Sequence, residues 1–471
     1  MSKTILVWFR NDLRIHDNEI LLEAVKKSDR ILPVYCFDPR QFTETQFGTL
    51  KTGVRRAKFL IESVSDLKHS LQSLGGDLLV LTGKPEEILP SLVERYNITE
   101  VYHHREVATE ETRVSSLVED ALWKLRVNLK HFIGHTMYHK EDLPFPIKDI
   151  PDIFTTFRKK IERDSHIRPS FETPVSISVP VDLQPSNVPS LSDLSYDDVT
   201  DEPLAFMQFN GGETEGLKRL HYYLWEKDLL KSYKATRDGL LGSDYSSHLS
   251  PWLAVGCLST REVYWEVKKY ERERLANDST YWLVFELLWR DFFRFMFKKH
   301  GNMFFKETGF KDLAPAVSEN QLDLFEKWKT GTTGFPFIDA NMRELNATGF
   351  MSNRGRQNVA SFLVKDLHVS WRLGAAYFEE KLIDYSPASN WGNWAYIAGV
   401  GNDPRDKRYF DVLKQALEYD PKGEYVRYWI PELADIPGAA IHQPWQLTPQ
   451  QIDDFGVQLY PSLQTGSIKV A

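Results

Sequence analysis

The chain has 471 residues, and its 58 Lys and Arg against 66 Asp and Glu give a formal net charge of −8. At roughly 150 residues per domain, this length indicates about three domains, or two with a long linker, and ample chain for a large core. The two cysteines, Cys36 and Cys257, exclude a disulfide scaffold and a Cys-rich metal site, and they fit a reducing compartment. No apolar run has the length of a membrane span and no signal-peptide core is visible, so we expect a cytoplasmic protein without membrane association.

Tryptophan and charge are both unevenly distributed. Of 13 tryptophans, only Trp8 and Trp123 lie in the first 200 residues, which indicates that the second part of the chain differs in kind from the first. The net charge of −8 argues against a nucleic-acid partner. However, residues 135–205 carry 7 basic and 13 acidic side chains and residues 411–471 carry 4 and 8, so the rest of the chain is slightly basic. A groove of positive potential is therefore permitted.

The first 134 residues alternate short apolar runs with amphipathic segments. This pattern predicts an α/β domain with a doubly wound parallel sheet, Rossmann-like in outline. No G-x-G-x-x-G follows the first strand, which argues against a nicotinamide site. We expect strands over 3–9, 30–37, 78–81, 100–103 and 128–133, and helices over 18–28, 54–74, 86–96 and 110–125.

The second part of the chain has a different pattern. Residues 135–205 hold nine of the 24 prolines and have little periodicity beyond 150–163, so they predict a long linker that is at most partly ordered. From residue 206 to about 440 the pattern is almost entirely helical, and 441–471 form a short tail. We expect all-α structure, with helices over 213–227, 259–272, 281–299, 321–330, 336–348, 353–367 and 375–383.

Several familiar chemistries lack their motifs. The chain contains no H-E-x-x-H, no G-x-S-x-G, no G-x-x-x-x-G-K-[ST] and no pair of C-x-x-C motifs. Hydrolase and ATPase functions therefore lose their usual support, and we predict no metal site.

Residues 281–299, YWLVFELLWRDFFRFMFKK, place a carboxylate among aromatic side chains. Glu286, Trp289, Arg290 and Phe293 fall on one helical face. A carboxylate in such surroundings is costly unless it is paired or useful, and its pKa is sensitive to its neighbours. The alternative is an ordinary core helix with an internal Glu286–Arg290 pair, and the segment alone does not decide between them.

Three further segments combine polar and aromatic residues. In 349–363, Asn353, Arg354 and Gln357 crowd a helix start capped by Ser352, which suits a base edge or a heteroaromatic ring better than a plain solvent-facing turn. Residues 382–402 predict a Ser-, Asn- and Gly-rich turn that brings backbone close to a flat ligand. In 243–258, hydroxyl groups could hold a phosphate, although a Ser-rich turn is usually just a loop.

Together these segments resemble the cryptochrome/photolyase family, and within it the DASH-type cryptochromes. The resemblance covers essentially the whole chain, from VWFRNDLRIHDN to EYVRYWIPEL, and is strongest in TGFPFIDANMREL, TGFMSNRGRQN and DYSPASNWGNWAYIAGVGNDPR. It implies an α/β antenna domain, a helical domain that binds FAD in a U-shape, and the use of blue light.

The resemblance also implies a set of FAD contacts. Asn390 matches the position that faces the flavin N5, and Asp384 matches a carboxylate paired with an arginine, here Arg356. The flavin ring would lie against 384–390, which includes Ser386. The phosphates would be held by Tyr233, Ser246, Ser247, Leu249 and Ser250.

The implied activity is light-driven repair of cyclobutane pyrimidine dimers by electron transfer. The implied lesion pocket consists of Glu286, Trp289, Asn353, Arg354, Gln357 and Tyr396. Gln357 and Tyr396 stand where duplex photolyases usually have Met and Trp. This difference is DASH-like and implies a preference for single-stranded, dimer-containing DNA, with the protein acting as a monomer. A blue-light photoreceptor with little repair activity, and a duplex photolyase, are the alternatives.

Two accessory features follow from the same resemblance. Trp394 and Trp371 match the first two members of an electron-transfer chain, but Ser318 stands at the usual third position, so Trp328 or Tyr377 would have to complete the path or photoreduction would be impaired. In the first domain, Glu106 matches a contact to a 5,10-methenyltetrahydrofolate antenna, and its alternative is a solvated Glu at a helix start.

Overall fold

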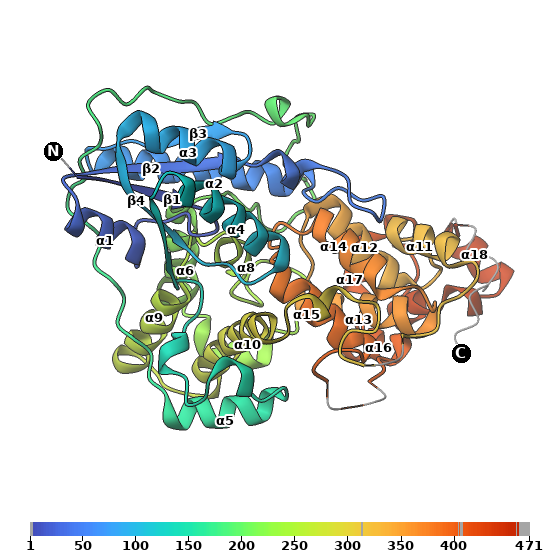
Figure 1. Cartoon of the computed structure of the whole chain (residues 1–471). Coiled ribbons are helices and arrows are strands. Elements are labelled where there is room, and N and C mark those ends of the chain that lie inside the picture. Colours follow the sequence, from blue (N-terminus) through green and yellow to red (C-terminus); the bar gives the residue numbers. More distant parts are fainter. Residues whose placement is uncertain (1–2, 312–313, 404, 406–407, 458, 461–471) are drawn as a thin grey trace.

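The computed structural model describes residues 3–311, 314–403, 405, 408–457 and 459–460 (Figure 1). Its N-terminal part contains a parallel sheet with the strand order β3-β2-β1-β4-β5. The strands are β1 Thr4–Phe9, β2 Arg30–Phe37, β3 Leu79–Thr82, β4 Ile98–His104 and β5 Asn128–Phe132. The predicted doubly wound α/β fold is confirmed.

Alternate side chains of the central strand, β1, point to opposite faces of the sheet, and a layer of helices covers each face. In β1, Ile5 and Val7 contribute to one buried cluster and Leu6 and Trp8 to the other, because successive side chains of a strand point to opposite faces. Helices α1 and α2 cover the first face, and α3 and α4 cover the second. Their bounds are α1 Glu19–Lys27, α2 Val54–Ser73, α3 Pro85–Tyr96 and α4 Thr109–Lys124.

The C-terminal part is helical, as predicted; in Figure 1 its first helices lie below the sheet and α11 to α18 extend to the right. Its main helices are α6 Glu213–His221, α9 Thr260–Glu273, α10 Asp278–His300, α11 Gln321–Thr330, α12 Pro336–Thr348, α13 Asn353–Ser361, α14 Trp371–Lys381 and α15 Pro387–Ala398. Shorter helices are α7 Tyr233–Thr236, α8 Ser250–Ala254, α16 Val412–Tyr419, α17 Glu424–Trp429 and α18 Pro449–Phe455. A π-helical turn continues α6 over Tyr222–Glu226 and α13 over Phe362–Asp366, which accounts for the longer helices expected there.

The turn expected over 382–402 is wrong, because most of this segment forms α15. Its Gly and Asn content concealed a helix that begins with Pro387 at its first position and ends at Gly399, whose φ of +79° is left-handed. Gly392 is required by close packing, since a Cβ there would lie 2.4 Å from the Phe293 ring of α10. The helix therefore uses glycine where two helices approach each other.

Residues 135–205 pack more closely onto the molecule than a free linker would. The Ile31 amide donates to the Ser178 carbonyl at 2.8 Å, and the Ile177 amide donates to the Leu74 carbonyl at 2.9 Å, so this segment follows the ends of β2 and α2. The segment also contains α5, Phe154–Asp164, which lies beside α10 in Figure 1.

Buried charges join the sheet to the helical part. Arg294 of α10 donates to Glu106 at 2.8 Å, and Arg261 of α9 donates to Asp17 at 2.6 Å. Asp291 of α10 accepts from two backbone amides, at 3.0 Å and 2.9 Å, that follow β5. The two ion pairs are buried, so loss of one partner from either pair would leave an uncompensated buried charge. These contacts fix α10 against the carboxyl-end edge of the sheet.

Within the described part of the chain, none of the helices has both the length and the apolar character that crossing a membrane requires.

One buried carboxyl group provides a test of this packing. Glu344 of α12 accepts a hydrogen bond from the Tyr425 hydroxyl at 2.7 Å, and burial raises the pKa of Glu344 to about 8. Between the ordinary pKa of a glutamate and a pH of about 8, the native state keeps a proton on Glu344 that the unfolded chain has already released. The free energy of unfolding therefore falls as the pH rises through this range. We expect Glu344→Gln to remove this loss, at about 1.4 kcal/mol per unit of pKa difference.

The measurement is urea unfolding of wild type and Glu344→Gln at a series of pH values between 5 and 9 (roughly the window over which the group titrates). The difference in unfolding free energy between the two proteins should grow with pH and level off at high pH. Exposed Glu418, replaced in the same way, is the control. A pH-independent difference for Glu344→Gln would contradict the assignment.

Candidate functional site

A buried carboxylate brings α13, α8 and the start of α15 together. Arg356 of α13 donates to both oxygens of Asp384, at 3.0 Å and 2.8 Å, and the Ser250 hydroxyl donates to the same carboxylate at 2.6 Å. The Asp384 side chain is 2 % exposed, so these three donors stabilise a charge that burial alone would disfavour. Three residues predicted from widely separated segments thus share one site.

The Ser-rich turn lies beside this carboxylate. Tyr233 is buried and its hydroxyl interacts with Ser246, while burial raises the pKa of Tyr233. Arg219 of α6, which our sequence analysis missed, donates to the carbonyls of Ser246 at 3.0 Å and Ser247 at 2.9 Å. Its position in an ordinary amphipathic helix gave no signal of this role. Arg219 holds the turn in a shape that brings the predicted phosphate-binding residues together.

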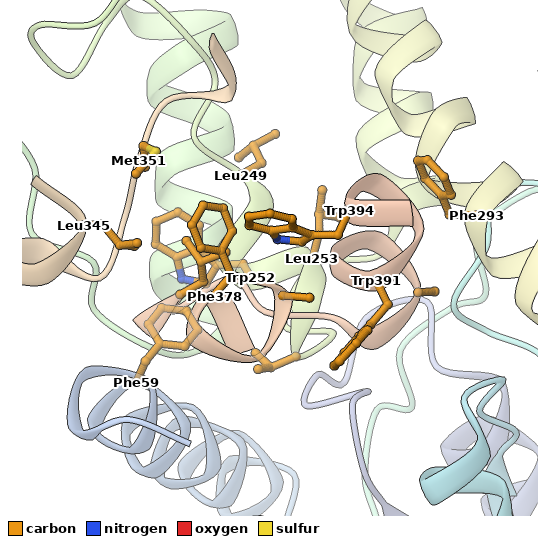
Figure 2. Packing of buried hydrophobic residues seen from close by; sticks show 14 of the residues in the cluster. Phe59, Leu249, Trp252, Leu253, Phe293, Leu345, Met351, Phe378, Trp391 and Trp394 are labelled. Atoms are coloured by element: carbon orange, nitrogen blue, oxygen red, sulfur yellow. The ribbon is translucent and has the colours of Figure 1, made fainter. Parts of the chain in front are cut away.

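The start of α15 presents a fixed amide near the same place. Asn390 is buried, and its side-chain nitrogen donates to the Ala375 carbonyl of α14 at 2.9 Å. Its backbone amide donates to the carbonyl of buried Ser386 at 2.9 Å. The first of these bonds sets the orientation of the Asn390 amide. Leu249, another residue of the predicted FAD contacts, is buried in the hydrophobic core (Figure 2).

Glu286 pairs with a residue outside its own helix. Its carboxylate lies 2.8 Å from the Arg237 guanidinium, in the loop after α7. Burial raises the pKa of Glu286, and the Arg237 charge partly opposes this shift. The alternative of an internal Glu286–Arg290 pair is wrong, because Arg290 instead donates to backbone carbonyls, including that of Leu253 at 2.9 Å.

A second ion pair runs beside the first. Asp238, the neighbour of Arg237, lies 2.9 Å from the Arg354 guanidinium, which also donates to the Gln357 side chain at 3.0 Å. The Arg354 guanidinium stacks 4.4 Å above the Tyr419 ring. Two adjacent loop residues thus connect α10 to α13. The sequence analysis missed both, although they lie only four and five residues after Tyr233.

This cluster retains unused polar atoms. The Oδ1 atom of Asp238 and the Nε atom of Arg354 are buried and have no hydrogen-bond partner in the described ranges. Buried polar atoms without partners are costly and mark places where a ligand can supply them. Asn353, by contrast, is exposed at the first position of α13, so the structure does not bring it into the paired cluster. Ser352 caps α13 as predicted, accepting from the Gly355 amide at 2.9 Å.

Trp289 and Tyr396 meet across α10 and α15. Their rings lie 5.8 Å apart in an edge-to-face arrangement, and Arg408 donates to the Tyr396 hydroxyl at 2.9 Å. Phe154 of α5 stacks on Trp289 at 3.6 Å. One face of Trp289 is therefore covered by a residue that our sequence analysis assigned to the linker.

The buried tryptophans form two separate ring contacts. Trp394 packs against Phe378 at a centroid distance of 5.1 Å (Figure 2). It also packs against Trp328, at 6.2 Å. Trp371 packs edge-to-face on Trp391 at 5.8 Å. A Cβ at Gly374 of α14 would lie 2.3 Å from the Trp394 ring, so glycine is what lets this ring rest on the helix backbone.

The position expected to hold a third tryptophan plays a structural role. The Ser318 hydroxyl donates to the Leu367 carbonyl at 3.0 Å. Trp328, however, touches Tyr377 at 5.8 Å as well as Trp394, so it joins the first member of the predicted chain to a second aromatic residue.

Glu106 is buried, so its alternative assignment as a solvated residue is wrong. One oxygen accepts from Arg294 at 2.8 Å, and the other accepts from Asn11 at 2.9 Å and lies 3.3 Å from His135. The nearby cations hold the pKa of Glu106 well below its usual range despite its burial. Both oxygens are thus already engaged by the chain itself.

Comparison with known proteins decides the family. The family model "DNA photolyase" matches residues 5–175, and "FAD binding domain of DNA photolyase" matches residues 282–464. A "Cryptochrome DASH" of Gloeobacter violaceus is 54% identical over 97% of this chain and 91% of that protein. This chain is a DASH-type member of the cryptochrome/photolyase family.

Solved structures agree with this assignment. The Synechocystis cryptochrome superposes with a TM-score of 0.95 at 50% identity, covering 98% of this chain and 95% of that chain. A class III photolyase of Agrobacterium tumefaciens superposes with a TM-score of 0.85 at 28% identity, covering 98% and 93%. The helical part of this DASH-type protein is accordingly an FAD-binding domain.

The residues around Asp384 suit that cofactor. An anionic, ring-bearing ligand needs hydrogen-bond donors, a flat apolar wall and a fixed polar edge, and Arg356, Tyr233, the Ser-rich turn and Asn390 supply them from different helices. FAD in this site would supply the light absorption and the electron chemistry. The chain's part is to bind and orient it.

We expect Asp384→Ala to release FAD, because the substitution leaves the half-buried Arg356 guanidinium unpaired and frees Ser250. Loss of one partner of such a pair costs about 3–5 kcal/mol. The measurement is the ratio of flavin to protein absorbance after purification, with exposed Asp323→Ala as the matched control. Full flavin content in Asp384→Ala would contradict the assignment.

Proposed function

We propose that this protein repairs cyclobutane pyrimidine dimers in single-stranded DNA, using blue light and electron transfer from bound FAD. The observation that carries the proposal is a set of side chains on three helices: Glu286 and Trp289 on α10, Arg354 and Gln357 on α13, and Tyr396 on α15. Two of these helices also reach the candidate FAD site, because Arg356 of α13 binds Asp384 and Asn390 lies on α15. Acidic, amide, guanidinium and aromatic groups are what a flipped pyrimidine pair requires for hydrogen bonding and stacking.

Glu286 has the central role in this proposal. Burial raises the pKa of Glu286, and in its neutral form the carboxyl can donate a hydrogen bond to a pyrimidine carbonyl that gains negative charge. Arg237 limits this shift and holds the side chain in place. The unpartnered Arg354 Nε and Asp238 Oδ1 atoms can then take donors and acceptors on the bases.

We attribute the preference for single-stranded DNA to two polar residues of the lesion pocket, Gln357 and Tyr396, that are each bound by an arginine. Gln357 is bound by Arg354, and Tyr396 is bound by Arg408, so these two positions present polar, tethered groups to the lesion. Extruding a dimer from a duplex costs a few kcal/mol, which such a wall offsets poorly, whereas a single strand avoids much of that cost. Exposed Lys159 and Lys160 of α5, beside the Trp289 helix, can meet the phosphates of the strand.

The test illuminates fully reduced holoprotein with dimer-containing oligonucleotides, single-stranded and duplex, and measures intact pyrimidines by chromatography. We expect faster repair of single strands and a drop of about tenfold or more for Glu286→Ala, with exposed Glu273→Ala as the control. No repair of either strand type would refute the proposal and favour the photoreceptor alternative.

Arg237→Ala gives the same test a pH readout. Without the Arg237 charge, the pKa of Glu286 should rise further. The neutral carboxyl then persists to higher pH. In a plot of repair rate against pH, the fall in rate at high pH should therefore occur at a higher pH than in wild type. An unchanged pH dependence would show that Glu286 does not act as a donor.

We also propose a route by which electrons reach the flavin. Trp394 receives electrons from Trp371 in the family pattern, but the contacts of Trp328 with Trp394 and Tyr377 offer a branch that does not need a tryptophan at 318. Because electron hopping falls steeply with distance, direct ring contact favours this branch.

We expect Trp328→Phe to slow photoreduction of the flavin severalfold while leaving FAD content unchanged. The measurement is the rate of flavin bleaching under blue light with an external reductant. Trp252→Phe is the matched control, because Trp252 is equally buried but its ring contacts Phe59 and Phe209. Equal rates for Trp328→Phe and wild type would place the whole path on Trp371.

For the antenna we propose 5,10-methenyltetrahydrofolate, although not on Glu106. Recognition of a pterin by a carboxylate requires access to its oxygens, and the Glu106 side chain is fully buried with its two oxygens bound by Arg294 and Asn11. Glu106 therefore fits an interdomain ion pair better than a folate contact. Folate released by denaturing the purified protein and identified by mass spectrometry would support the antenna itself.

A further inference from the structure

A small cavity lies where the carboxyl ends of β4 and β5 meet the last turns of α10. Its volume is about 30 Å³, enough for about two water-sized groups. It is separate from the residues around Asp384 and Glu286. Its lining residues include Arg105, Glu106, His135, Lys140, Arg294 and Lys298.

The lining carries more positive than negative charge. Arg294 and Glu106 neutralise each other. The side chains of Arg105, Lys140 and Lys298 form no hydrogen bond or ion pair with any residue that the structure describes. Three cations from three segments thus surround a cavity with no acidic group free to pair with them.

Lysines and histidines at the end of α10 do not all lack partners. Lys299 and His300, the next two residues of α10, both pair with Asp152, at 2.9 Å and 2.5 Å. Lys298 alone of the three faces the cavity. Burial and the repulsion of Lys140 and Arg105 lower the pKa of Lys298 to about 8, so its positive charge is disfavoured where it stands.

We propose that Arg105, Lys140 and Lys298 form a binding site for an oxyanion, a phosphate or carboxylate group, at the seam between the sheet and α10. An anion in the cavity would replace mutual repulsion by three charge-assisted hydrogen bonds, and a carboxylate or phosphate oxygen pair matches the available space. His135 and the neutralised Glu106–Arg294 pair close the inner wall. The proposal is independent of the repair activity, because none of these residues lies in the Glu286 cluster.

An anion bound at this site would also stabilise the contact between the α/β domain and helix α10. Arg105 follows β4, Lys140 follows β5, and Lys298 belongs to α10, so one anion would connect all three. A ligand that binds only this arrangement stabilises the folded state by mass action.

The test is isothermal titration of the flavin-loaded protein at low ionic strength with inorganic phosphate and, separately, with glutamate. Both titrations are referenced to chloride at matched ionic strength. We expect saturable one-to-one binding of at least one of the two anions, and the stronger one identifies the phosphate or the carboxylate class. Lys298→Met and Lys140→Met should each weaken it by about tenfold or more, as expected for a lost charged hydrogen bond.

Lys124→Met, at an exposed position of α4, is the matched control and should bind like wild type. Thermal unfolding with and without the anion checks that the Met variants are folded, and the anion should raise the melting temperature of wild type more than that of Lys298→Met. Binding no stronger than chloride, or equal binding by wild type and Lys298→Met, would overturn the proposal.

Discussion

The ion pair between Arg356 and Asp384 joins the parts of the chain that carry the candidate cofactor contacts and the candidate lesion contacts. It joins α13, which carries Arg354 and Gln357, to the segment that leads into α15, which carries Asn390. A carboxylate this deeply buried is tolerated only because both of its oxygens are bound, so the two helices cannot separate without exposing a charge to an apolar interior. The same contact therefore orients the residues proposed for the cofactor and those proposed for the lesion.

The lesion cluster shows a second use of buried charge. Glu286 and Arg354 do not pair with each other but with the adjacent loop residues Arg237 and Asp238. Each of these side chains is thus held by a partner. Arg354 nevertheless retains an unpartnered Nε atom, and burial raises the pKa of Glu286. Such prior orientation lowers the conformational entropy that these side chains would lose on binding a ligand.

Sequence periodicity was sufficient for the sheet and for most helices, because their apolar stripes are set by burial against neighbouring layers. It failed at α15, where close helix packing demands glycine at Gly392 and so imitates a turn. It also failed for Arg237 and Asp238, since their importance comes from partners on other helices. Glu106 illustrates the same limit: an acidic residue before a helix is usually solvated, and only the fold places Arg294 against it.

The uneven distributions of charge and tryptophan acquire different explanations in the structure. Positive charge gathers on α5 and at the seam of Arg105, Lys140 and Lys298, so a chain with a net charge of −8 still presents two places for anions. Tryptophan is abundant in the helical part because wide rings fill the gaps between crossing helices. Where two such rings touch, as Trp328 and Trp394 do, core packing supplies the ring contact on which the proposed electron branch depends. The proposed branch therefore needs no tryptophan at position 318, because it runs through residues that are buried for packing reasons.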